Sequence, residues 1–158
     1  IDFINDILEL VIMEFKYIAI SKGLTLKIEN QIGMEVYLKI DSYTVGQICA
    51  NLFDNAIKYT EMGTITARLT NHNGYLQLDI IDTGIGISEE YIPNLFNKFS
   101  QEEQGYTRRF DGNGLGLALV KKYCDINNAE IKVFSKKYSG STFSVIFKKD
   151  KFSLTNES

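Results

Sequence analysis

The sequence predicts an α/β (α+β) two-layer sandwich in which a mixed, mostly antiparallel β-sheet is covered on one face by three main helices. Helical stretches are interleaved with pairs of β-rich runs rather than with single strands. The chain has 158 residues, of which 44% are hydrophobic, so it is long enough to bury one core. No internal repeat or domain boundary is visible, so we expect one domain over residues 1–150 and a frayed tail over 151–158.

The helices are predicted from apolar residues that recur every three or four positions. One start is marked by Asp41 and Ser42, because either side-chain oxygen can accept the free backbone N–H groups of a first helical turn. A short extra helix is expected from Ser88 past Pro93 to about residue 98. The three main helices are expected at residues 1–21, 41–60 and 115–127.

The strands are predicted from short β-rich or alternating runs bounded by turn residues. The clearest case is a hairpin, because Asn and Gly in the turn at residues 71–74 tolerate positive backbone dihedral angles. The three expected strand pairs join 24–29 to 35–40, 64–70 to 75–81, and 130–137 to 142–149.

Composition excludes several classes of function. The formal charge of -3 and the pI near 5.2 do not suit a surface that binds nucleic acid. No apolar run approaches the roughly 20 residues of a membrane-spanning helix, so we expect a cytoplasmic domain without direct membrane contact, whose parent protein could still be membrane-anchored. Cys49 and Cys124 lie in apolar helical patterns and are expected to be reduced core thiols. The single histidine, His72, excludes a site that needs several imidazoles.

Three polar residues of the second helix could form a ligand site. Asn51, Asn55 and Lys58 are spaced by four and three positions, so they share one helical face. Asn carbonyl oxygens suit Mg²⁺, and a lysine ammonium suits a phosphate. A solvated helix face is an equally good interpretation of these three residues alone.

A carboxylate and two glycines follow the strand that begins at Tyr75. Asp82 at the strand end could accept a hydrogen bond from an exocyclic amine, and Gly84 and Gly86 would let the backbone approach a planar ligand. A tight turn that needs glycine for its dihedral angles is the alternative.

A second glycine cluster directly precedes the third helix. Gly112, Gly114 and Gly116 would expose N–H groups at a helix start, which is an anion site. The cluster is neither a dinucleotide fingerprint, since Leu117 takes the last glycine's place, nor a P-loop. The preceding loop carries Thr107, Arg108 and Arg109 and could close over phosphates, although surface arginines without a ligand explain it as well.

Taken in order, these motifs resemble the catalytic ATP-binding domain of sensor histidine kinases, a branch of the superfamily that includes gyrase B, the Hsp90 chaperones and MutL. The resemblance spans roughly residues 41–147. The matching motifs are the N box at 51–60, the G1 box at 82–87, the F box at 95–99, the G2 box at 112–117 and a terminal glycine motif at 140–143.

The resemblance implies a Bergerat-type ATP-binding fold, with ATP between the N-box helix and a flexible lid, and Mg²⁺ as the metal. Asp82 would take the adenine amino group, Gly86 would let the base approach, and Thr142 would support the Asp82 region. Asn55 would ligate the metal, with Asn51 near its water shell. The nucleotide-binding set implied by the motifs is Asn51, Asn55, Lys58, Tyr59, Asp82, Gly84, Gly86, Ile87, Phe99, Thr107, Gly112, Gly114, Leu115, Gly116, Leu117 and Thr142.

The same resemblance assigns the catalytic candidates. Lys58 and Tyr59 would contact the phosphates and the nucleoside, and Arg108 or Arg109 would contact the γ-phosphate from the lid. The rings of Phe96 and Phe99 would anchor the base of the lid. The catalytic set is Asn51, Lys58, Arg108 and Arg109.

One position separates the kinases of this superfamily from its ATP-hydrolysing members. The hydrolysing members have a Glu four residues before the metal-binding Asn, whereas this chain has Asn51, which cannot act as a base. The resemblance therefore implies a histidine kinase that transfers the γ-phosphate to an outside nucleophile. Two alternatives stay open, a nucleotide-binding regulatory module without kinase activity and an ATPase like the gyrase or chaperone relatives.

The phosphoacceptor is expected to lie outside this chain. His72 falls at a hairpin tip and lacks the acidic neighbour and long helical hairpin of a phosphoacceptor domain. The implied partners are that helical-hairpin domain of the same parent protein and, indirectly, a response regulator receiver domain.

Overall fold

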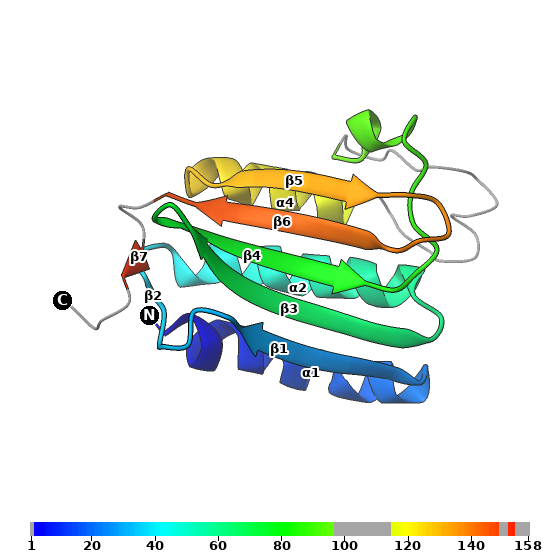
Figure 1. Ribbon diagram of the computed structural model, residues 1–158, viewed down its shortest axis with the longest axis horizontal. Coiled ribbons are helices and arrows are strands. Elements are labelled where there is room, and N and C mark those ends of the chain that lie inside the picture. The colour runs from blue at the N-terminus through cyan, green and yellow to red at the C-terminus, as the bar shows by residue number, and fades with distance from the viewer. Residues whose placement is uncertain (1, 97–114, 149–151, 154–158) are drawn as a thin grey trace.

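The computed structural model describes residues 2–96, 115–148 and 152–153, and the findings below concern these residues. A five-stranded sheet forms one layer, and the helices cover one face of it (Figure 1). The strand order is β1-β3-β4-β6-β5, in which β1 runs parallel to β3 and every other pair is antiparallel. The strands are β1 (Leu24–Asn30), β3 (Gly63–His72), β4 (Tyr75–Asp82), β5 (Glu130–Ser135) and β6 (Ser141–Phe147).

Three main helices make up the second layer, as predicted. They are α1 (Glu9–Ser21), which follows a π-helical turn η1 (Ile4–Leu8), α2 (Ser42–Tyr59) and α4 (Leu115–Ile126). Helix α2 begins as expected, because the Asp41 carboxylate accepts the Thr44 N–H at 3.2 Å. The sheet layer and the helix layer together confirm the predicted sandwich.

Within the described residues, no helix combines the length and the apolar character needed to cross a membrane.

The core lies between these two layers. Alternate residues of the central strand β4, Leu76, Leu78 and Ile80, point toward the helices and are fully buried. Burial of each such side chain is worth about 1.5 to 3 kcal/mol. Cys49 and Cys124 are buried free thiols, as the sequence predicted.

The predicted pairing of 24–29 with 35–40 is wrong. Strand β1 pairs in parallel with β3, starting with Leu24 opposite Gly63. Parallel strands need a crossover connection, and here α2 carries the chain back to the end of the sheet where β1 begins. Of the second run, only Tyr37–Leu38 is a strand, β2, and it belongs to a separate small sheet.

Two further expectations need correction. Phe152–Ser153 forms strand β7, antiparallel to β2, so the tail expected over 151–158 is not frayed at these two residues. The helix expected from Ser88 is only a 3₁₀ turn, η2 (Ile92–Asn94), among the described residues. The Ser88 carbonyl accepts N–H bonds from Tyr91 and Ile92, and Pro93 can supply no N–H to extend an α-helical ladder.

Candidate functional site

Helices and strands of both layers end or begin at the same end of the sheet. Helix α2 and strand β4 both finish there, and strand β6 starts there (Figure 1). Asp82 at the end of β4 is paired with Ser141 at the start of β6. The β3–β4 turn with His72 lies at the opposite end of these strands.

Asp82 is the buried charge of this site. Its side chain is 5% exposed, and its Oδ1 accepts the Gly84 N–H at 2.9 Å and the Ser141 N–H at 3.2 Å. Burial raises the pKa of Asp82 to about 6, against the opposing effect of these two N–H donors. Among the described residues no group donates to Oδ2, so this oxygen can serve a ligand.

A buried hydroxyl lies beside this carboxylate. Thr60, which directly follows α2, is fully buried, and its Oγ1 has no hydrogen-bond partner within the described part of the chain. A Cβ on Gly84 would lie 2.3 Å from the Tyr59 carbonyl oxygen, 2.8 Å from Thr60 Oγ1 and 2.9 Å from Asp82 Oδ1. Gly84 thus leaves room for both polar groups. Sequence reasoning placed Thr60 in the N box but gave it no role, because only its burial marks it as unusual.

The face of α2 that carries Asn51 meets the first turn of α4. Asn51 Nδ2 is buried and has no partner among the described residues. Asn51 Oδ1 lies 3.9 Å from the position a Cβ would take on Gly116, in the first turn of α4. Asn55 and Lys58 follow on the same face of α2, and Lys58 Nζ is 3.0 Å from Asp54 Oδ2. The ammonium group of Lys58 has three N–H donors, so this ion pair leaves donors for a phosphate.

The glycine-rich loop after β4 is fixed by the protein itself. Gly86 has a φ of +71°, and a Cβ there would lie 2.0 Å from the Lys136 carbonyl oxygen. The tight-turn interpretation of Gly86 therefore holds without any ligand. On either side of it, Ile85 N–H donates to the Tyr59 carbonyl at 3.2 Å and Ile87 N–H to Ser135 Oγ at 2.8 Å.

The ladder register places Ser141, rather than Thr142, beside Asp82. Thr142 is opposite Ile81 in the ladder, so its side chain lies on the face of the sheet away from Asp82. Ser141 is opposite Asp82 and donates the backbone bond to it. Successive strand residues face opposite sides, so a shift of one residue reverses the assignment.

Ser135 is a second residue that sequence reasoning missed. Its Oγ donates to the Gly140 carbonyl at 3.0 Å, accepts the Ile87 N–H, and lies 2.7 Å from Ser141 Oγ. The one hydroxyl hydrogen of Ser135 is used by Gly140, so Ser141 is the donor in the pair of hydroxyls. Ser135 thereby ties the glycine-rich loop to the turn between β5 and β6.

The remaining candidates fall into two groups. Leu117 is partly buried against the core, and Leu115 is the first residue of α4. The Phe96 ring packs edge-on against the Phe143 ring, with 6.4 Å between the ring centroids. The candidates that lie outside the described residues are Phe99, Thr107, Arg108, Arg109, Gly112 and Gly114.

Known sequences resemble this chain over most of its length. Residues 40–151 match the family described as histidine kinase-, DNA gyrase B-, and HSP90-like ATPase. The chain is 37% identical over 135 residues to the autoinducer 2 sensor kinase/phosphatase LuxQ of Vibrio harveyi, covering 82% of this chain and 16% of that protein. It is also 37% identical over 110 residues to the sensor histidine kinase RcsC of Escherichia coli K12, covering 70% of this chain and 12% of that protein.

Solved structures show the same fold. Full-length ShkA, whose structure is a complex with AMPPNP, superposes with a TM-score of 0.77 at 24% identity, covering 94% of this chain and 30% of that one. The catalytic domain of the histidine kinase ThkA superposes with a TM-score of 0.77 at 21% identity, covering 94% of this chain and 95% of that one. The chain thus spans a small part of the curated relatives and nearly all of an isolated catalytic domain.

Proposed function

Because the chain belongs to the family of histidine kinase-, DNA gyrase B- and HSP90-like ATPases, we propose that it binds Mg-ATP and transfers the γ-phosphate to a histidine on a separate helical-hairpin domain. The observation that carries the proposal is the set of buried polar groups at the end of the sheet. Asp82, Thr60 and Asn51 each have an atom without a partner among the described residues, which suits a polar ligand.

The Asp82 end suits the adenine base. At neutral pH the Asp82 carboxylate is ionised, since its pKa is about 6, so it can only accept hydrogen bonds. The exocyclic amino group of adenine is a donor that Oδ2 could accept, whereas the carbonyl of guanine in that position would face a second acceptor. Thr60 Oγ1 can donate to a ring nitrogen or to a water beside it.

The α2–α4 end suits the phosphates. Mg²⁺, when bound there, would neutralise phosphate charge. The Asn55 amide oxygen is a suitable ligand for that ion, and Asn51 lies one turn earlier on the same face. Lys58 on the same face of α2 supplies a positive charge for a phosphate. Backbone N–H groups at the start of α4, Gly116 among them, can donate to phosphate oxygens.

Two features favour phosphoryl transfer to an outside acceptor. Asn51 has an amide where the hydrolysing relatives have a carboxylate, so it does not deprotonate water. His72 is exposed and lies at the far end of β4, a strand of eight residues or about 25 Å from Asp82. The acceptor histidine and the response regulator that receives the phosphoryl group therefore belong to other domains in this proposal.

Incubation with γ-labelled ATP and Mg²⁺ tests the proposal. We expect no label on this chain alone and label on a histidine of a helical-hairpin domain supplied from the parent kinase. The Asp82→Asn variant should lose the transfer. ATP binding without transfer would instead support the regulatory module, steady-state ATP hydrolysis would support the ATPase, and label on His72 would contradict the assignment of a separate acceptor.

A further inference from the structure

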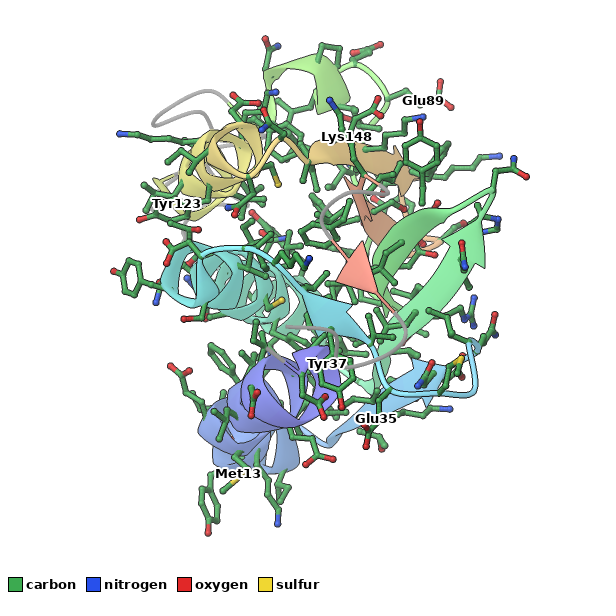
Figure 2. The ribbon with its side chains drawn as sticks, turned by 90° about the vertical axis from the view of Figure 1, so that its left-hand side faces the viewer. Met13, Glu35, Tyr37, Glu89, Tyr123 and Lys148 are labelled. Carbon is green, nitrogen blue, oxygen red and sulfur yellow. The ribbon has the colours of Figure 1, made fainter. Side chains whose placement is uncertain are left out.

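Helix α1 is apolar on two opposite sides. Val11, Phe15 and Ala19 pack into the core. By the 100° turn per residue, a second apolar stripe lies on the far side of the helix. Its members are large and exposed: Leu10 57%, Met13 66%, Tyr17 79% and Ile20 60%. In Figure 2, Met13 points away from the body of the molecule.

The stripe has the pattern of a helix–helix seam. Its residues are spaced by three, four and three positions, which are the a and d positions of a heptad repeat. Glu9 and Lys16 flank it on one side and Glu14 on the other, at the g and e positions. An exposed apolar stripe with charged borders of both signs is typical of a surface that another helix covers.

A groove beside the stripe offers room for a partner's side chains. It has a volume of about 600 Å³ and lies between α1 and the edge strand β1. Met13 and Ile20 line it from the helix, and Leu26 and Ile28 line it from the strand. Apolar side chains on one flank of a docked helix can therefore bury themselves between α1 and β1.

We propose that an amphipathic helix from another part of the parent kinase docks on this stripe of α1. Its apolar residues would cover Leu10, Met13, Tyr17 and Ile20, with an acidic residue beside Lys16 and a basic residue beside Glu14. The proposal depends on the proposed function in one respect, because it takes this chain to be one domain of a longer kinase.

Charge disfavours a second copy of this chain as the occupant. In an antiparallel pair centred on the stripe, Lys16 would face Lys16 of the copy and Glu14 would face Glu14. In a parallel pair, Glu9 would face Glu14 of the copy on both sides of the seam. A helix of different sequence avoids these repulsions. Two of the three border charges are acidic, and with the net charge of -3 they disfavour an anionic membrane surface.

The length of the stripe favours an occupant in the same chain. From Leu10 to Ile20 it rises only about 15 Å, or three helical turns. Four side chains over three turns bind a free helix weakly, whereas a tether raises the effective concentration to the millimolar range. The matched region makes up only 16% of LuxQ, so a kinase of that size has ample chain to supply such a helix.

Oxidative footprinting of the parent kinase and of this isolated chain tests the proposal. Met13 and Tyr17 should be labelled several-fold more slowly in the parent. Met62, 79% exposed, and Tyr138, 81% exposed, lie elsewhere and serve as matched internal controls whose labelling should not change. Equal labelling of Met13 and Tyr17 in the two proteins overturns the proposal.

Charge variants sharpen the test. Lys16→Glu in the parent should restore much of the labelling at Met13, because the acidic residue of the docked helix would be repelled. Lys132→Glu makes the same charge change on β5 and should leave Met13 protected. Concentration-dependent dimers of the isolated chain in sedimentation, or its binding to phosphatidylserine vesicles, would contradict the chosen occupant. None of these readouts depends on phosphoryl transfer, so the proposal and the kinase assignment can fail separately.

Discussion

Asp82 and Ser141 face each other across the β4–β6 pair, and the Ser141 backbone N–H donates a 3.2 Å hydrogen bond to Asp82 Oδ1. The Gly84 N–H donates to the same oxygen. Backbone atoms thus hold one carboxylate oxygen in place and leave the other for a ligand. Since the donors are backbone groups, the orientation of the carboxylate depends on strand register and loop geometry rather than on neighbouring side chains.

Replacing Asp82 by Asn should weaken ATP binding about 10- to 100-fold. The change removes a charged acceptor worth about 1.5 to 3 kcal/mol and puts an NH₂ group where a ligand amine can lie. Titration calorimetry with Mg-ATP measures the effect. Asp79→Asn, three residues earlier and on the opposite face of β4, is the matched control and should bind ATP normally. Equal affinities for the two variants would remove Asp82 from the site.

The stability of the nucleotide-free protein should depend on pH through the same carboxyl group. The pKa of Asp82 rises from 3.8 to about 6 on folding. Between about pH 4 and about pH 6, therefore, the carboxyl group is protonated in the folded state and ionised in the unfolded chain. Stability from this group is complete below about pH 4 and is lost as the pH rises to about 6 and above, by about 2 to 3 kcal/mol. Melting temperatures of the wild type and Asp82→Asn across pH 4 to 7 check the sign: the wild type should fall relative to the variant as the pH rises.

Ser135→Ala should loosen the glycine-rich loop and lower ATP affinity several-fold. The variant leaves the Ile87 N–H and the Gly140 carbonyl without their partner, at a cost of about 1 to 3 kcal/mol each where they stay buried. Thr142→Val, one residue from Ser141 but on the other face of the sheet, keeps the side-chain shape and should leave affinity unchanged. A larger loss for Thr142→Val than for Ser135→Ala would favour the role first predicted for Thr142. Hydrogen exchange at Ile87 reports the loosening directly.

The elements that could be predicted from sequence depend on local signals. The Asp41 cap, the helical period of α2 and the Asn73–Gly74 turn each act within a few residues, and all three are observed. The parallel partner of β1 lies beyond α2 in the chain, and adjacency in sequence suggested the wrong pairing. The β2–β7 pair joins residues more than a hundred positions apart, which no local pattern encodes.

The residues of the candidate site likewise divide into those that a local sequence signal predicts and those that depend on contacts between distant segments. Asn51, Asn55 and Lys58 could be predicted to share a face because a helix fixes their spacing, and Asp82 because it ends a strand. The sequence could not distinguish Ser141 from Thr142, because the assignment depends on the ladder register with β4. Thr60 and Ser135 gain their importance from burial and from contacts with distant segments, which emerge only in three dimensions.

Lys58→Met should weaken Mg-ATP binding by about tenfold, because a phosphate contact loses its positive charge while the side chain keeps its length. Asp54 holds Lys58 at 3.0 Å on the same helix face, so Asp54→Asn frees the ammonium group and should leave affinity unchanged or slightly tighter. A comparison of the affinities for ADP and ATP in this variant shows which phosphate Lys58 contacts. Tighter binding by Lys58→Met, or a tenfold loss in Asp54→Asn, would contradict a phosphate contact from Lys58.

Two glycine-to-alanine changes should have opposite effects on stability. At Gly86, with a φ of +71°, an alanine Cβ would lie 2.0 Å from the Lys136 carbonyl oxygen, so backbone must move. We expect a loss of more than about 2 kcal/mol in the free energy of unfolding, together with weaker ATP binding, since the loop follows Asp82. Gly46 lies inside α2, and nothing is within 4 Å of an added Cβ. Gly46→Ala should therefore gain about 0.5 to 1 kcal/mol from helix propensity alone. Urea unfolding of both variants measures the two changes in the free energy of unfolding. An unchanged free energy of unfolding in Gly86→Ala would show that the turn does not require glycine.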